Sequence, residues 1–432
     1  MKPGYVKGLR WWMIGLVTAT FVINYLDRST LSVVITTLKS EFGITTAQYS
    51  YAVSAFQFSY MLMQPLAGTL MDIMGTKLGF AVFAACWSVA CMLHALLTGW
   101  ISMAFFRSLL GLSEAAAFPA AIKVVTDWFP DREKSVATGW FNSGTSIGAM
   151  IAPPVVAWCV LNYSWKFVFL GAGAAGLLWV VLWVIFYHDP KSHPCLSPAE
   201  RSFIRSGQTH APAERKRASR WTLLRSRYLW GLMAARFFGA PAWATFSFWI
   251  PIYLATVRDM SLKEIALFAW MPFLAADLGS IIGGYLCPIF MRHFGVSLIT
   301  SRKLVVATGA VLMFGPSCIG LASDKYVAVA LFCIGGFAHQ VLSGALITLA
   351  ADVFPRNEAA TASGLTGSAA WLAQALFSLV IGALASRIGY DPLFVMLGFF
   401  DVLAAAILWK SIPSEIKGAE TPRQAEEAPP CR

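Results

Sequence analysis

The feature that most constrains this chain is a series of apolar runs, each about long enough to cross a bilayer as a helix. Such a helix needs about 20 consecutive, mostly apolar residues. The sequence predicts twelve of these runs, near 11–36, 49–71, 77–98, 100–123, 138–161, 165–187, 228–256, 264–290, 303–323, 326–351, 359–385 and 390–411. The expected fold is therefore an all-α polytopic membrane protein with twelve transmembrane helices in two sets of six.

The composition argues against a water-soluble enzyme. Hydrophobic residues make up 57% of the 432 residues and charged residues only 13%, about half the usual share of charge. No Ser-His-Asp set, catalytic carboxylate pair or phosphate loop stands out, so we expect no enzymatic activity. The eight cysteines show neither Cys-x-x-Cys pairs nor metal-ligand spacing with histidine, so no metal or cofactor is expected.

The glycine pattern from Gly171 to Gly176 matches the dinucleotide-binding spacing G-x-G-x-x-G. It lies inside an apolar run, however, and no strand precedes it. We interpret these glycines as sites where helices approach closely, like two further pairs of small residues four positions apart, Gly144 with Gly148 and Gly279 with Gly283.

Positive charge predicts the topology. The polar segment 188–227 holds nine Lys or Arg residues and three acidic ones, and Lys2, Lys7 and Arg10 precede the first run. Basic loops stay in the cytoplasm, so this loop and both termini are expected there. The first run is too long for a signal peptide. The expected parts are a bundle at 1–187, a basic linker at 188–227, a second bundle at 228–411 and a tail at 412–432.

The two halves of the chain also resemble each other. A segment that starts at Asp127 and one that starts at Asp352 share Asp, Phe, Pro, Glu, Ala and Gly at a constant offset of 225 residues. They follow the fourth and the tenth run, so they occupy the same topological position. Parallel six-helix repeats around a binding site at the midplane are a transporter architecture.

The segment between the second and third runs carries Gly68, Asp72, Gly75 and Lys77. It resembles the loop motif of the major facilitator superfamily, although Ile73 occupies one of the motif's basic positions. We expect a gating hinge in which Asp72 caps a helix or pairs with a cation. The alternative is a simple topology signal.

Longer segments are similar to the anion:cation symporter family within that superfamily, and to bacterial hexuronate transporters in particular. They lie at 24–28, 60–65, 106–120, 141–154, 335–348 and 364–372. The resemblance covers nearly the whole chain apart from the central loop and the tail. It implies a carrier of the inner membrane that moves glucuronate and galacturonate inward with protons. The alternative is another organic anion, such as an aldarate or an aldonate.

Ionisable residues inside apolar runs are costly and usually functional. The resemblance implies that Asp27 and Glu114 couple the proton and that Arg28 or Arg107 meets the substrate carboxylate. The alternative is a structural ion pair between helices. The resemblance also implies a sugar site lined by Tyr25, Tyr60, Thr145 and Trp371.

Three further residues have open roles. His339 either contributes to the site or bonds to a neighbouring helix, while Arg236 and Asp277 either line the path or brace the second half. The expected partners are a small organic anion, protons and the lipid bilayer, with no nucleic acid and no second subunit. A sensor is disfavoured because the chain has no sizeable soluble domain.

Overall fold

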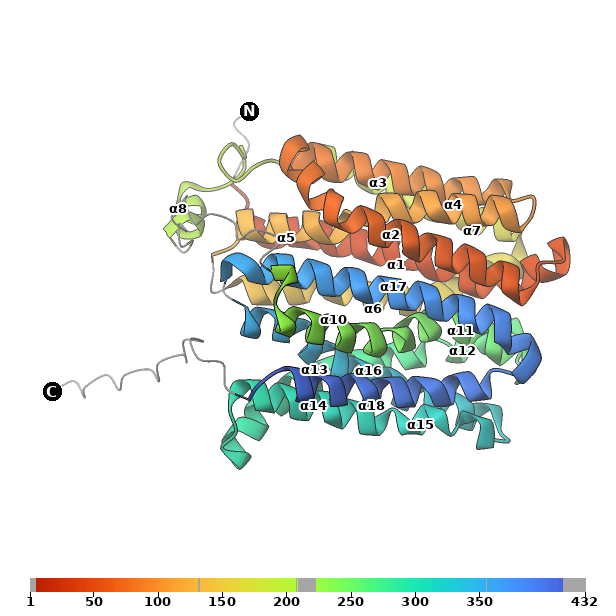
Figure 1. Ribbon diagram of the computed structural model, residues 1–432. Coiled ribbons are helices and arrows are strands. Elements are labelled where there is room, and N and C mark those ends of the chain that lie inside the picture. The colour runs from red at the N-terminus through yellow and green to blue at the C-terminus, as the bar shows by residue number, and fades with distance from the viewer. Residues whose placement is uncertain (1–4, 131–132, 207, 209–222, 355, 415–432) are drawn as a thin grey trace.

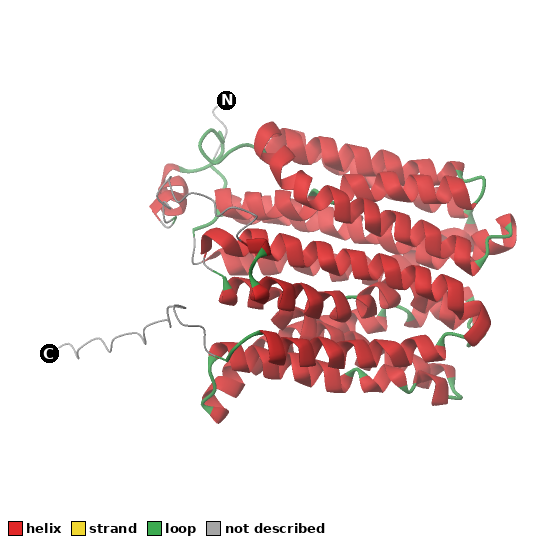
Figure 2. Ribbon diagram, viewed as in Figure 1, coloured by secondary structure: helices red, strands yellow, loops and turns green. Residues whose placement is uncertain are grey.

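The computed structural model is a bundle of long helices that run roughly parallel and antiparallel to one another (Figures 1 and 2). It describes residues 5–130, 133–206, 208, 223–354 and 356–414, and this described part contains no strand. The first half consists of α1 (Leu9–Phe42), α2 (Thr46–Met74), α3 (Thr76–Leu93) with the 3₁₀ turn His94–Leu96, α4 (Trp100–Glu114), α5 (Ala117–Trp128), α6 (Lys134–Asn162) and α7 (Trp165–Phe186).

A short helix, α8 (Pro198–Ser206), lies in the linker between the halves. The second half consists of α10 (Arg227–Gly239), α11 (Pro241–Thr256), α12 (Leu262–Phe268), α13 (Met271–Phe294), α14 (Leu298–Leu312), α15 (Phe314–Ser317) with the 3₁₀ turn Ile319–Leu321, α16 (Lys325–Val353), α17 (Arg356–Ile388) and α18 (Asp391–Ser411). The basic cluster of Arg215, Lys216, Arg217 and Arg220 lies outside the described residues, as does most of the tail.

Ten helical stretches of the described chain are long and apolar enough to cross a membrane. This confirms the multi-pass all-α fold and ten of the twelve predicted runs. The other two runs are helical but do not meet the same criterion. One is α2, which carries the polar residues Gln48, Gln57 and Gln64, and the other is divided into α10 and α11 before Pro241. Proline at the start of a helix has no N–H to continue the preceding one.

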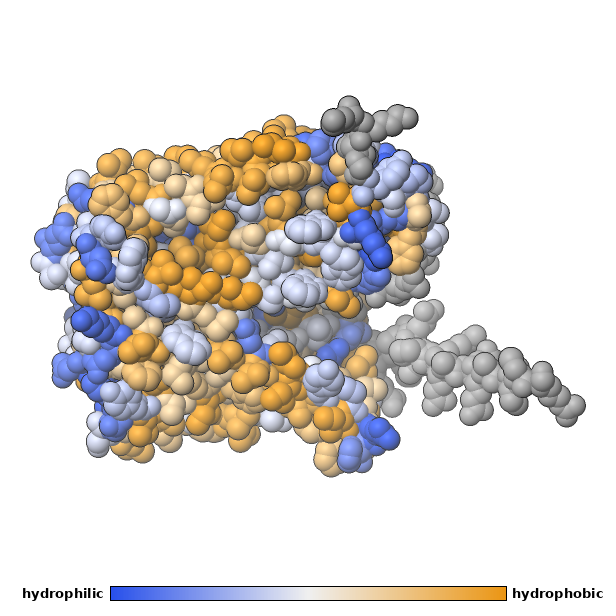
Figure 3. All heavy atoms as spheres, turned by 180° about the vertical axis from the view of Figure 1, so that it is seen from behind, coloured by the Kyte–Doolittle hydropathy of each residue, from blue (hydrophilic) through white to orange (hydrophobic). Residues whose placement is uncertain are grey.

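The outer surface carries the apolar side chains expected of a protein in lipid. On α7, for example, Leu178, Val181, Ile185 and Phe186 are all exposed. Figure 3 shows an orange apolar band across the molecule, with hydrophilic residues gathered at its two ends. The start of α1 and the end of α18 lie at the same end of the bundle (Figure 1), which we call the terminal end.

Glycines allow helices to pack backbone against backbone. A Cβ atom on Gly144 or Gly148 of α6 would lie 2.5 or 2.3 Å from the carbonyl oxygens of Thr18 and Val22 in α1. Other glycines whose Cβ would lie within 3.0 Å of a neighbouring helix include Gly173, Gly176, Gly279 and Gly283. The helix-packing interpretation is therefore confirmed for these glycines but not for Gly171, where a Cβ would meet nothing within 4 Å. No strand lies beside the dinucleotide pattern in the described chain.

The internal repeat is visible in the structure. Helix α5 ends at Trp128 and α16 ends at Val353, again 225 residues apart, and the next residue, Phe129 or Phe354, is extended in both cases. In the second half Arg302 donates to Asp352 at 3.1 Å. The corresponding positions in the first half are Lys77 and Asp127, so the same charge types recur.

The two halves contact each other through α2 on α17, α1 on α11, and α6 on α12 and α13. The Tyr49 hydroxyl donates to the Phe248 carbonyl at 2.7 Å, and the Ser54 hydroxyl donates to the Ala375 carbonyl at 2.9 Å. Both bonds lie in the first turns of α2, remote from the terminal end. The halves are therefore closed at the end opposite the termini.

Candidate substrate site

The site begins at a break in the helix that contains Glu114. Glu114 is the last residue of α4, and α5 starts at Ala117. Pro119 causes the break, because it has no N–H for the Ala115 carbonyl and its ring displaces the preceding turn. The break lies beside the Glu114 carboxylate, at the centre of the first half.

Arg28 and Glu114 form a buried ion pair between α1 and α4. The Arg28 Nε donates to Glu114 Oε2 at 2.6 Å. The Glu114 side chain is fully buried, and its second oxygen, Oε1, has no hydrogen-bond partner. Both residues are among those predicted from the sequence, and an ion pair between helices is one of the two alternatives given for them. The structure identifies the pair as Arg28 with Glu114.

Aromatic rings surround the Arg28 guanidinium. Its carbon lies 4.8 Å from the ring centroid of Tyr25, 4.9 Å from that of Tyr60 and 5.7 Å from that of Trp371. The Tyr60 and Trp371 rings lie 4.2 Å apart, although they come from different halves. Because a cation is attracted to ring faces, this cage holds Arg28 where the two halves meet.

Asp27 and Arg107 are also buried in the first half. Asp27 is 1% exposed and neither of its oxygens has a hydrogen-bond partner. Arg107 is also 1% exposed, and its Nη2 donates to the Arg28 carbonyl at 3.3 Å, while Nε and Nη1 have no partner. Unpaired buried polar groups are costly, so this region is arranged for something other than stability.

A cavity of about 390 Å³ lies between the halves. Four of the predicted site residues line it, namely Tyr25, Thr145, His339 and Trp371. Arg28, Tyr60, Arg107, Asp27 and Glu114 are not among its lining residues. Several of the lining residues, such as Leu346 to Thr348, belong to the part of α16 nearer the terminal end. Figure 3 shows a recess between the lobes on that side.

Other lining residues were not predicted from the sequence: Asn142, Trp243, Ser280, Gln340, Ser343 and Gln374. One signal could have revealed Gln374, which lies three residues after Trp371 and so shares its face of the helix. Trp243 could not be separated by sequence from the many tryptophans of the apolar runs.

The structure also places the three residues whose roles were open. His339 lines the cavity and stacks on Trp243, with ring centroids 5.8 Å apart and an interplanar angle of 18°. Arg236 lines the same cavity. Asp277 of α13 accepts a hydrogen bond from Ser146 of α6, so it braces one half against the other.

The predicted gating loop is a tight connection at the terminal end. Asp72 pairs with Lys123 of α5 at 2.8 Å, which agrees with the expected cation partner. Gly75 has a φ of 76° between α2 and α3, a conformation that favours glycine. The Lys77 carbonyl accepts from Trp183 Nε1 at 3.0 Å. Ile73 is 75% exposed, and a Cβ on Gly68 would meet nothing within 4 Å.

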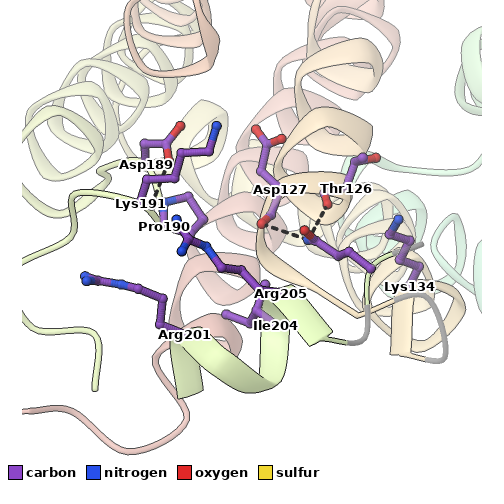
Figure 4. A pocket seen from close by; sticks show the side chains of 10 residues that line it. Thr126, Asp127, Lys134, Asp189, Pro190, Lys191, Arg201, Ile204 and Arg205 are labelled. Atoms are coloured by element: carbon purple, nitrogen blue, oxygen red, sulfur yellow. Dashed lines mark hydrogen bonds between the residues drawn. The ribbon is translucent and has the colours of Figure 1, made fainter. Parts of the chain in front are cut away.

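A second, larger cavity of about 520 Å³ lies at the terminal end, beside α8 (Figure 4). Its charged lining residues are Asp127, Lys134, Asp189, Lys191, Arg201 and Arg205. Gln208 closes one side by donating to the carbonyls of Thr126 and Asp127 at 3.0 and 3.2 Å. All these residues belong to the first half and the linker. A substrate that crosses between the halves would not pass through this cavity.

Comparison with known proteins finds relatives that match most of this chain. The chain is 52% identical over 406 residues to the hexuronate transporter of Escherichia coli strain K12, covering 94% of each chain. It is 48% identical to the galacturonate transporter of Dickeya chrysanthemi, covering 75% of this chain and 95% of that one. Both relatives are named as transporters and not as enzymes.

Among solved structures, the fold is similar to a bacterial homologue of the human lysosomal transporter Spinster in an inward-facing, unoccupied conformation. The TM-score is 0.77 and the identity 17%, covering 94% of this chain and 97% of that one. The profile of the Major Facilitator Superfamily matches residues 17–301 and 292–431. The chain therefore belongs to the Major Facilitator Superfamily, as its loop motif and repeated halves predicted.

Proposed function

We propose that this protein carries hexuronates, such as galacturonate and glucuronate, together with protons across the bacterial inner membrane. The Arg28–Glu114 ion pair beside the cavity between the halves is the observation that carries this proposal. It combines a cation for the substrate carboxylate with an acid for the proton. The names of the two relatives support the substrate class.

The coupling follows from competition for one arginine. A substrate carboxylate that reaches Arg28 takes over part of its planar fork of donors. Glu114 then loses its counter-charge while it remains buried, and an uncompensated buried carboxylate is costly. It therefore takes up a proton. Binding of substrate and binding of the proton thus favour each other, as linkage requires. Asp27, which is buried without a hydrogen-bond partner, is the second candidate for the proton.

Transport then requires the halves to alternate about the site. The bundles 1–187 and 228–411 would be the two moving units, connected by the linker 188–227 and followed by the tail 412–432. The basic linker favours a cytoplasmic position for the terminal end, in which case the cavity would face inward in this structure. Arg28 and Trp371 lie on opposite sides of the interface, where this movement would change their contact. We expect a monomer to suffice.

Uptake into proteoliposomes tests the proposal directly. Labelled galacturonate should accumulate when an inward proton gradient is imposed and should only equilibrate without it. Unlabelled glucuronate, galactonate and galactarate are then added as competitors. Accumulation that ignores the proton gradient would refute the coupling. Competition by an aldonate or an aldarate, but not by glucuronate, would assign the substrate to that other class of anion.

A further inference from the structure

Three arginines of the described chain lie inside the bundle near the centre, and of these three only one faces the cavity without a carboxylate partner. Arg28 is bound to Glu114 and enclosed by aromatic rings. Arg107 is 1% exposed and donates to the Arg28 backbone. Arg236, from α10 in the second half, lines the cavity. A negatively charged ligand that entered this conformation would therefore meet Arg236 first.

Arg236 shows the features of an unoccupied anion contact. Among the described residues it forms no salt bridge, and its Nε is buried without a hydrogen-bond partner. A guanidinium has five donors and no acceptor, and leaving buried donors unsatisfied is costly. A carboxylate that bound to the fork of Arg236 would satisfy these donors.

The neighbours of Arg236 suit a polar ring that carries one negative charge. His339 and Trp243 form a stacked pair on the same wall. Ser343 and Gln374 also line the cavity and offer partners for hydroxyl groups. No acidic residue is among the lining residues of this cavity. No carboxylate among these lining residues competes with a bound ligand for Arg236.

We infer that Arg236 binds the carboxylate of the substrate in the conformation that is open toward the terminal end. This rests on the proposed function for the class of substrate, a sugar acid, and adds an anion contact in the second half. Arg236 would select acids over neutral sugars there while the Arg28–Glu114 pair remains intact. Arg28 would take the carboxylate when the halves rearrange and Glu114 is protonated.

Ligand binding to the purified full-length protein tests the inference, since Trp243 and Trp371 line the cavity and report occupancy by their fluorescence. The ligands are galacturonate and its uncharged methyl ester. In Arg236→Gln the affinity for galacturonate should fall by about tenfold to a hundredfold, as expected for lost hydrogen bonds to a charged group. The affinity for the ester should not change.

Two further variants sharpen the test. Arg236→Lys keeps the charge without the bidentate fork, so its affinity for the acid should be intermediate. If Arg236→Gln does not fold, the affinity of Arg236→Lys for galacturonate tests the inference instead. Arg227→Gln is the matched control, because Arg227 begins the same helix and contacts Tyr228 instead of the cavity. It should bind both ligands like the wild type.

Unchanged galacturonate affinity in the Gln and Lys variants would overturn the inference, as would an equal loss for acid and ester. If the wild type does not bind galacturonate, the same variants are measured with galactonate and galactarate. A selective loss for the acid that does bind would support Arg236 while the hexuronate proposal fails. Binding of none of these acids would overturn both.

Discussion

At the scale of single residues, the decisive feature is a set of ionisable groups buried inside the bundle. Removing one partner of a buried ion pair usually costs about 3–5 kcal/mol, because the other charge remains unpaired. Glu114 is bound to Arg28, whereas Asp27 has no hydrogen-bond partner. The two carboxylates are thus in different environments, and we expect different phenotypes when each is neutralised.

Glu114→Gln imitates the protonated acid. It should bind galacturonate with weaker pH dependence and retain counterflow exchange, since neither needs a net proton transfer. It should fail to accumulate substrate against a gradient. If Asp27 shares the proton, Asp27→Asn should likewise retain binding and exchange but fail to accumulate substrate. If Asp27 only positions Arg28, Asp27→Asn should only bind substrate more weakly. Proton-driven accumulation that survives in both single variants and in the double variant would disprove the coupling mechanism.

Replacing Arg28 or Arg107 by Lys keeps the charge but removes the planar fork. Arg28→Lys should lower transport at least about tenfold, equivalent to roughly 1.4 kcal/mol, while the amount of protein in the membrane stays the same. Arg107→Lys should also lower transport, because it weakens the bond that holds the Arg28 backbone. Initial uptake rates, normalised to expression, measure both effects. Normal uptake by both variants would show that neither arginine serves the anion.

At the scale of helices, close packing depends on glycines that meet the backbone of a neighbour. Gly148 of α6 is the clearest example, because its Cβ would lie 2.3 Å from the Val22 carbonyl oxygen. Helix α1 also carries Asp27 and Arg28, so its position against α6 determines where the ion pair lies.

Gly148→Ala should therefore destabilise the protein by about 1–3 kcal/mol through overpacking. Gly171→Ala is the matched control, because a Cβ there meets nothing within 4 Å. Thermal unfolding in detergent compares the two variants, and the midpoint should fall only for Gly148→Ala. Equal midpoints would mean that α1 and α6 can separate at no cost.

At the scale of the whole molecule, the proposed transport cycle requires at least two arrangements of the same halves, of which this structure would be one. Its closed end depends on contacts between α2 and α17, and Gly382 is at the tightest of them. A Cβ on Gly382 would lie 1.9 Å from the Ser50 hydroxyl. A larger side chain would prevent this end from closing and would shift the population toward the opposite conformation.

We therefore expect Gly382→Val to close the terminal end. The readout is Thr348→Cys, a residue that lines the cavity, labelled by a membrane-impermeant maleimide from the terminal side. Labelling at this position should slow severalfold relative to the same cysteine variant without Gly382→Val. Gly284→Val is the control, because Gly284 is exposed with no neighbour within 4 Å. Identical labelling in the two valine variants would contradict the assignment of the closed end.

Local features of the sequence are sufficient to predict the helices, the repeat of the two halves and several candidate site residues. Apolar runs, helix-breaking prolines and buried charges have energetic consequences in a bilayer that do not depend on distant contacts. Asp27, Arg28 and Glu114 are therefore recognisable as candidates from their positions within apolar runs alone.

Which of these residues meet depends on the tertiary fold. Arg107 and Glu114 lie two turns apart on one helix, yet Glu114 pairs with Arg28. Trp371 packs on Tyr60, which belongs to the other half of the chain, and Arg236 faces the cavity instead of bracing the second half. Such pairs depend on how each helix is rotated about its axis and on how closely glycines let two helices approach. Those quantities are set by the packing of the whole bundle, and no local pattern contains them.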